Sequence, residues 1–348
     1  MSNLSMAFHL ALGLFVYLIL AQGAEGNIDD FDCVEIYKQP AFQHPLLKNH
    51  KIQETFSSYD ENPKGSNKDE TKEYCPKGTV AIIRQRNGTE NFHPNTAEYF
   101  AQHFATIETM LDGTIYRGAE ADISIHDLKL QGVQFSKSQI WIENGPAGQL
   151  NSIQAGWAVH PRIYGDSVTR FTIHWTRDDY KDTGCYNTQC PGFVVVSRNP
   201  RIGGQFPGTS FYGKTSLLFT VQIFQDPFSG NWALKLNNEV IGYWPKELFT
   251  HLNEGASLVR YGGNTFMSPD EISPPMGNGH FPVSDYTKTA HFKNVLLINS
   301  KYKKIYVEDS KVRRYADSYS CYRVTYWGYT RSSGVSFAFG GPGGKCGD

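Results

Sequence analysis

The sequence lacks an excess of charge of either sign. Its 33 lysine and arginine residues stand against 34 aspartate and glutamate residues, which gives a formal net charge of −1. No long basic run occurs, and because binding to nucleic acid depends on clustered positive charge, nucleic acid is not an expected partner. Beyond the first 26 residues no apolar run approaches the length of a membrane span.

Several catalytic motifs are also missing. There is no CxxC, no HExxH and no close histidine pair, so neither a metal nor a cofactor is expected. There is no GxSxG elbow for a nucleophilic serine. The GGPGG at 340–344 has no following helix to hold phosphate, and a turn-rich tail is the better interpretation.

The six cysteines are the first positive signal. An even number of cysteines in a secreted chain predicts disulfides, and metal binding is the competing use. Neighbourhood in the chain favours the pairs Cys33–Cys75, Cys185–Cys190 and Cys321–Cys346. Three structural bridges are therefore expected.

The N-terminus has the features of a secretory signal. Residues 1–23 contain an apolar run followed by small residues, with Ala21-x-Gly23 as the expected cleavage site, although lysine and arginine are absent before the run. An uncleaved membrane anchor is the alternative. Asn87-Gly88-Thr89 is a sequon, which predicts a glycan in a surface loop of a secreted, extracellular protein.

A polar stretch divides the rest of the chain. Residues 55–74 are charged and poor in large apolar groups, which is typical of a linker or loop. The piece that contains it, 24–94, is too small to fold alone, so it is expected to lean on a main domain at 95–348.

From residue 97 onward the pattern is mostly β. Asp112-Gly113 predicts a hairpin turn, and one short helix is expected to start at Pro245. Further strands are expected at SQIWIE, NSIQAGWAVH, VTRFTIHW, FVVVS, LLFTVQIF, NWALKL, EVIGYW, ASLVRYGG and HFKNVLLIN. Short strands without intervening helices indicate an all-β fold, an antiparallel β-sandwich of two packed sheets.

Five stretches carry a resemblance to a known family: NSIQAGWAVHPRIYGD, TGCYNTQCPGFVVVS, NEVIGYWPKELFTHL, YGGN and PPMGNGHFP. Together they resemble the plant neprosin-type glutamic peptidases, and DCVEIYKQPAFQHPLLKNHKIQ resembles that family's activation peptide. The resemblance implies a secreted precursor with a removable activation segment, and a β-sandwich. It also implies cleavage of peptides after proline in acid by two glutamates that face each other across a groove.

Both glutamate positions hold amides in this chain. The family's I-E-x-G-W motif places its first glutamate at Gln154, and its W-G-G-E motif places the second at Asn264. A glutamate that often precedes that tryptophan in the family is Arg260 here. Hydrolysis by activated water needs a proton acceptor, and an amide has no accessible proton-accepting state. The catalytic dyad is therefore expected to be impaired.

The function expected first is that of a pseudopeptidase or peptide-binding module for an extended, proline-rich peptide. Trp157 belongs to the buried face of its strand, whereas Arg260, Tyr261, Trp175, Tyr243 and Trp244 are candidates for the substrate groove. One alternative is an active acid prolyl endopeptidase with a substituted carboxylate, and the other is a sandwich that binds cell-wall glycan in the apoplast. Candidates for that carboxylate are Asp166, Asp178, Asp179, Glu239 and Glu254.

Maturation follows from the same resemblance. The family boundary corresponds to His93-Pro94-Asn95. A chain that cannot cut itself is expected to keep residues 24–94 unless another protease removes them, and the retained segment would then be the chain's own partner, covering the groove.

Overall fold

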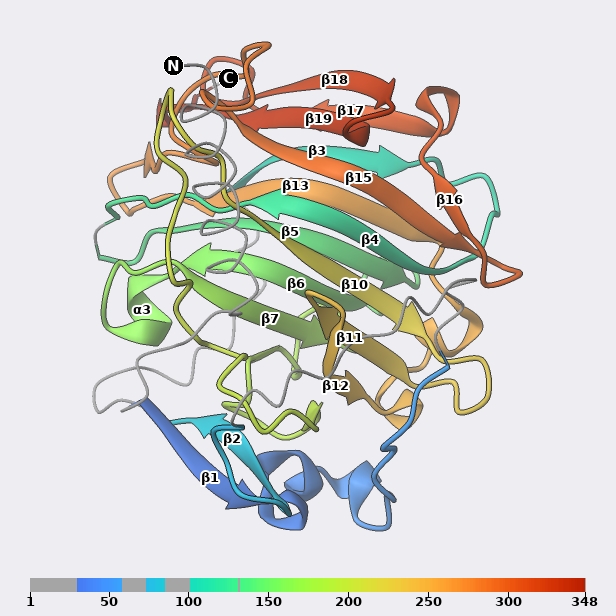
Figure 1. The fold of residues 1–348 in the computed structure, drawn as a ribbon. Coiled ribbons are helices and arrows are strands. Elements are labelled where there is room, and N and C mark those ends of the chain that lie inside the picture. Colours follow the sequence, from blue (N-terminus) through green and yellow to red (C-terminus); the bar gives the residue numbers. More distant parts are fainter. Residues whose placement is uncertain (1–29, 58–72, 85–100, 131, 348) are drawn as a thin grey trace, which may run out of the picture.

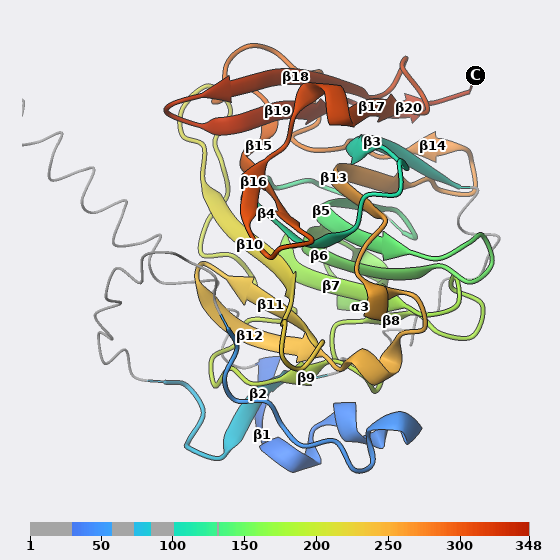
Figure 2. The ribbon, with the colours of Figure 1, turned by 90° about the vertical axis from the view of Figure 1, so that its right-hand side faces the viewer.

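The computed structural model describes residues 30–57, 73–84, 101–130 and 132–347. Two large antiparallel sheets make up most of this part of the chain (Figure 1), and the view turned by 90° shows them packed as the layers of a sandwich (Figure 2). The all-β sandwich expected from the sequence is confirmed.

The first sheet has seven strands within the described residues. In spatial order they are β17 (Val312–Ala316), β3 (Gln102–Thr109), β13 (Leu258–Phe266), β5 (Phe135–Asn144), β6 (Asn151–Val159), β7 (Arg170–Thr176) and β8 (Cys185–Tyr186).

The second sheet has nine strands in the same described part. Their order is β18 (Arg323–Thr330), β19 (Gly334–Gly340), β15 (Ala290–Asn299), β4 (Tyr116–Ser124), β10 (Leu218–Gln225), β11 (Trp232–Leu236), β12 (Glu239–Trp244) and β9 (Val194–Val195), with β16 (Lys304–Tyr306) paired to β15. A two-stranded sheet of β14 (Ile272–Ser273) and β20 (Gly344–Lys345) lies apart from both.

Alternation along the strands forms the core between the two large sheets. In β6, Ile153, Ala155, Trp157 and Val159 belong to the central hydrophobic cluster, as the sequence predicts. The Trp157 Nε1–H donates to the Ser124 carbonyl of β4 at 2.8 Å, which ties one sheet to the other. Ser152, Gln154, Gly156 and Ala158 therefore lie on the opposite, polar face of the seven-stranded sheet.

The hairpin predicted at Asp112-Gly113 is wrong. Strand β3 before this turn pairs with β13 and β17, whereas β4 after it pairs with β10 and β15, so the turn passes from one sheet to the other. Gly113 does adopt a left-handed φ of 85°, and the Asp112 carboxylate accepts from the Thr114 N–H at 3.0 Å. The Asp-Gly signal thus locates a tight turn without fixing which strands pair.

Helical structure is short throughout the described ranges. The helix expected at Pro245 consists of two 3-10 turns, η5 (Lys246–Leu248) and η6 (Leu252–Glu254), and Leu248 and Leu252 are buried as expected. One α-helical turn, α3 (Pro161–Tyr164), ends at Gly165. The other 3-10 turns are η2 (Ile36–Lys38), η3 (Pro40–Gln43), η4 (Pro45–Leu47) and η7 (Asp309–Lys311).

The N-terminal segment docks at the β9 and β12 edge of the nine-stranded sheet. Its own two strands, β1 (Phe31–Glu35) and β2 (Thr79–Ile83), form a small sheet at the bottom of Figure 1. The Gln39 amide bonds both backbone groups of Val195 in β9, accepting from its N–H at 2.7 Å and donating to its carbonyl at 3.1 Å. Leu47 is fully buried in the central cluster. The segment therefore leans on the main domain.

All three predicted disulfides are confirmed: Cys33–Cys75, Cys185–Cys190 and Cys321–Cys346. The first of them joins β1 to the residues that precede β2. Among the residues described, no helix is long and apolar enough to cross a membrane. The predicted signal at 1–23, Asn87 and the boundary at His93–Asn95 lie outside the described residues.

Candidate functional site

The two amides expected at the dyad positions lie on the polar face of the seven-stranded sheet. Gln154 is on β6 and Asn264 is on β13, and β5 runs between these strands. Gln154 stands opposite Trp141 of β5, whereas Asn264 stands opposite Lys137. The two positions thus belong to cross-strand rows on either side of Gln139.

Gln139 bridges the two amides. Its Nε2 donates to Gln154 Oε1 at 2.8 Å and to Asn264 Oδ1 at 3.4 Å. Gln154 Nε2 donates in turn to the Tyr180 hydroxyl and to Ser152 Oγ, and Asn264 Nδ2 donates to Gln102 Oε1 at 2.7 Å. These three buried side chains, Gln139, Gln154 and Asn264, are called the amide triad below.

Two glycines flank the centre of the triad. Gly262 and Gly156 are the direct cross-strand neighbours of Gln139. A Cβ on Gly156 would lie 2.0 Å from the Ser138 carbonyl oxygen and 2.5 Å from Gln139 Cα. A Cβ on Gly262 would lie 2.2 Å from the Ala105 carbonyl oxygen. The two glycines therefore allow the backbones to approach closely and leave Gln139 without a side chain on either of its cross-strand neighbours.

Gly156→Ala is expected to destabilise the protein by about 1–3 kcal/mol, because the added methyl group forces β6 away from β5. The check is the urea midpoint of unfolding. Gly347→Ala is the matched control, since a Cβ there meets no atom within 4 Å. Equal midpoints for the two variants would show that the close approach at Gly156 is unimportant.

A buried charged cluster adjoins the triad. The Ser152 hydroxyl donates to Glu143 Oε1 at 3.1 Å, which connects Gln154 to that carboxylate through two hydrogen bonds. Arg260 lies between two buried acids, with Nε 2.9 Å from Glu143 Oε2 and Nη1 3.5 Å from Glu108 Oε1. Burial raises the pKa of Glu143, while Arg260 and the Ser152 hydrogen bond act in the opposite direction. Arg260 thus adds no net positive charge to the face.

The other side of the triad is aromatic. The Lys137 Nζ bonds the Tyr186 hydroxyl and lies 4.4 Å from the centroid of the Phe135 ring. The His174 ring stacks on Tyr186 with 3.9 Å between centroids, and on Tyr180 with 5.1 Å. These rings come from β5, β7, β8 and the loop before β8. Phe135, His174 and Tyr186 are buried, whereas Tyr180 of the loop is partly exposed beside Gln154.

The prediction that four aromatic residues line the substrate groove is wrong. Trp175 and Tyr261 belong to the core face of the seven-stranded sheet, since each pairs across the sheet with core residues. Trp244 is fully buried in the same core cluster. Tyr243 is buried beneath the N-terminal segment, and its hydroxyl bonds His50 at 2.8 Å and the Gln53 N–H at 3.0 Å. Aromatic content alone did not indicate which sheet face each ring occupies.

The predicted substitute carboxylates also lie elsewhere. Asp178 and Asp179 bond residues of nearby loops, Asp166 pairs with Arg170, and Glu239 pairs with Arg201. Glu254 lies in the 3-10 turn η6. The sequence analysis did not identify Gln139 or Glu143 as site residues. The available signal was alternation in the predicted strand SQIWIE, which places Gln139, Trp141 and Glu143 on one face. In the described ranges no group of three or more histidine, cysteine, aspartate or glutamate residues is placed to hold a metal ion.

The structure defines the class of protein as a two-sheet antiparallel β-sandwich. It carries an amide triad on its polar face and an N-terminal segment docked at a sheet edge. Residues 132–342 match the family described as Neprosin, and residues 22–91 match the family described as Neprosin activation peptide. The chain therefore belongs to the neprosin family.

Solved structures show more distant likenesses. Scytalido-glutamic peptidase with a peptide-based transition state analogue is 9% identical with a TM-score of 0.38, covering 69% of this chain and 97% of that one. SCP-B, an eqolisin-family peptidase in complex with the tripeptide Ala-Ile-His, is 9% identical with a TM-score of 0.36 and the same coverage. CG-16, a homodimeric agglutinin from chicken liver, is 11% identical with a TM-score of 0.25, covering 47% and 95%.

Proposed function

We propose that this protein is a catalytically impaired neprosin-type peptidase that binds an extended peptide on its polar face. The amide triad is the observation that carries the proposal. The hydrogen-bond partners of Gln154 are Gln139, Ser152 and Tyr180, and those of Asn264 are Gln139 and Gln102. None of these partners is a carboxylate, so among the residues that the structure describes neither amide bonds directly to a group that accepts a proton from water in the way a glutamate does.

The same triad suits binding. Amides offer both donors and acceptors, which match the backbone N–H and C=O groups of an extended peptide. The ring of Tyr180, which is partly exposed and whose hydroxyl accepts from Gln154, supplies flat apolar surface that suits a proline-rich sequence. We further propose that the protein is secreted and keeps its N-terminal segment, because three disulfides require an oxidising compartment and Leu47 of the segment completes the core.

Paired cleavage and binding assays test this proposal. The full chain is compared with the same chain after another protease has removed its N-terminal segment. Both forms are incubated with a library of proline-containing peptides from about pH 2.5 to 7, a span that crosses the ordinary carboxylate pKa values. Saturable binding without cleavage is the expected result. Cleavage after proline by either form, lost on Gln154→Ala, would reject the impaired-enzyme reading.

Glu143 favours a second candidate, an active acid endopeptidase with a relocated carboxylate. It is the carboxylate that reaches Gln154 through a single intervening side chain, Ser152. Its raised pKa also favours the protonated form, which is the form that a general acid needs. If the peptide assay detects cleavage, its abolition by Glu143→Gln assigns this residue.

A further inference from the structure

A buried arginine lies on the polar face away from the triad. Arg170 is the first residue of β7, and in the cross-strand register it follows Asn264, Lys137 and Ala158 in a single row. It is 1% exposed. At about 4.8 Å between strands, its Cα is roughly 14 Å from that of Asn264 along the row. Arg170 therefore lies within reach of a peptide that crosses the triad.

The main domain supplies one firm partner for Arg170 and the N-terminal segment supplies a looser one. Its Nη2 donates to Asp166 Oδ2 at 2.6 Å, and its guanidinium lies over the Tyr164 ring, 5.1 Å from the centroid. Asp30, immediately before β1, approaches Nη1 with Oδ2 at 3.8 Å. The pair with Asp30 is longer than a hydrogen bond, whereas the pair with Asp166 is within hydrogen-bond distance.

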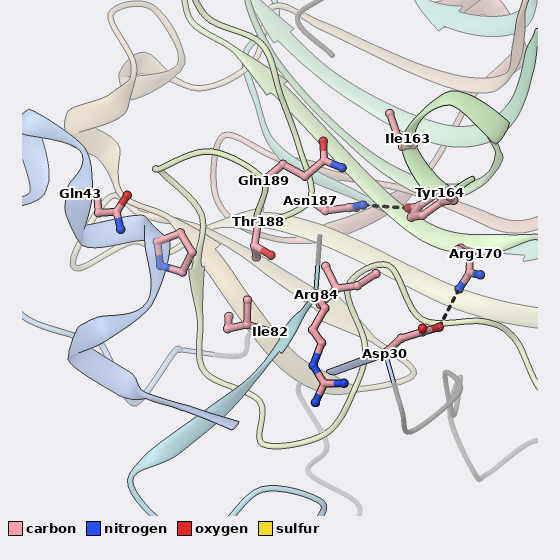
Figure 3. A pocket seen from close by; sticks show the side chains of 12 residues that line it. Asp30, Gln43, Ile82, Arg84, Ile163, Tyr164, Arg170, Asn187, Thr188 and Gln189 are labelled. Atoms are coloured by element: carbon pink, nitrogen blue, oxygen red, sulfur yellow. Dashed lines mark hydrogen bonds and ion pairs between the residues drawn. The ribbon is translucent and has the colours of Figure 1, made fainter. Parts of the chain in front are cut away.

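A cavity of about 220 Å³ separates the two sides at this point (Figure 3). Arg170, Tyr164, Asn187 and Thr188 belong to the wall formed by the main domain, and Asp30 lies on the wall formed by the segment. Figure 3 shows the Asp30 carboxylate directed at the Arg170 guanidinium. The cavity adjoins the Asp30–Arg170 pair, so a small carboxylate has room to bind at the guanidinium once the Asp30 side chain is removed.

We propose that Arg170 and the surrounding wall of the main domain form a carboxylate-binding subsite, which Asp30 of the segment occupies. A planar guanidinium can pair with both oxygens of a carboxylate, and the approach of Asp30 Oδ2 to Nη1 at 3.8 Å marks the side of Arg170 on which a carboxylate lies. The ligand is a peptide that carries an acidic side chain or its terminal carboxylate at this position. This identification of the ligand as a peptide rests on the function proposed above, whereas the subsite itself does not.

Chemical rescue in the full chain tests the subsite. Asp30→Ala removes the occupying carboxylate, and acetate is then added as the probe while sodium chloride keeps ionic strength constant. With acetate several-fold above its Kd, the Tm of Asp30→Ala is expected to rise by about 2 °C. Wild type should not respond, because Asp30 already fills the site.

Two comparisons make the result decisive. Asp32→Ala, which removes an exposed partner of Arg84, should show no acetate effect. Adding Arg170→Gln to Asp30→Ala should abolish the effect. The subsite is overturned if acetate fails to shift Asp30→Ala, or shifts wild type and Asp32→Ala equally. If the double variant does not fold, the comparison of Asp30→Ala with wild type still decides.

A peptide arm separates this inference from the proposed function. Peptides that end in a carboxylate and the same peptides ending in an amide are titrated into Asp30→Ala, with a preference of about tenfold for the carboxylate form expected, as for a charge-assisted pair. Acetate rescue without any peptide binding would retain the subsite and reject the peptide function. Peptide binding without a preference for the carboxylate form, and without acetate rescue, would retain the peptide function and reject the subsite.

Discussion

The double variant Gln154→Glu with Asn264→Glu is expected to cleave peptides after proline in acid at least about 10²-fold faster than the unmodified chain, because it restores a general base and acid. The surroundings already fit two carboxylates. Gln139 Nε2 lies 2.8 and 3.4 Å from the two amide oxygens and would donate to carboxylate oxygens in the same places. Lys137, directly opposite residue 264, would stabilise the new charge.

The single variants are expected to differ. Asn264→Glu supplies one carboxylate as a general base while Gln154 still donates hydrogen bonds, and should recover part of the activity. Gln154→Glu still lacks a carboxylate at 264 and should recover less. The measurement is the initial rate on a proline-containing peptide after removal of the segment, with Gln154→Ala plus Asn264→Ala as the control. Cleavage by wild type at the rate of the double glutamate variant would show that the amides do not limit catalysis.

Alternation along β6 was predictable from the sequence, because Ile153, Ala155, Trp157 and Val159 are apolar at every second position. This two-residue alternation correctly placed Gln154 on the polar face. The pairing of β3 was not predictable in the same way, since a two-residue turn fixes a change of direction but not the partner strand. In a sandwich the partner can lie in the other sheet, as it does after Asp112-Gly113.

The site itself was only half visible in the sequence. The resemblance to the family's motifs singled out Gln154 and Asn264, but Gln139 reaches them only because β5 lies between β6 and β13, and strand order is a property of the fold. The buried aromatics illustrate the same gap. Tyr243 and Trp244 are consecutive residues of one strand and point to opposite faces, and both faces of that strand are covered. Periodicity assigns a face, but it does not reveal what packs against it.

Arg260→Gln is expected to lower the free energy of unfolding by about 3–5 kcal/mol at pH 7, because it leaves buried carboxylates without their shared cation. Glu108 and Glu143 are both buried, and Arg260 is 3.5 and 2.9 Å from their oxygens. Arg313 also pairs with Glu108 at 2.6 Å, so Glu143 bears most of the loss. Urea unfolding at pH 7 measures the effect. Arg314→Gln is the control, since its pair with Asp309 is exposed and should contribute little.

The pH dependence separates charge from packing in the Arg260 cluster. Burial already raises the pKa of Glu143, and loss of Arg260 raises it further. A carboxyl whose folded-state pKa lies above its unfolded value costs stability where it must ionise, and that cost is relieved as the pH falls below the folded-state value. The difference between Arg260→Gln and wild type should therefore shrink from pH 7 to pH 4. An equal loss at both pH values would mean that Arg260 supports the polar face through packing alone, and the charge argument for this cluster would fail.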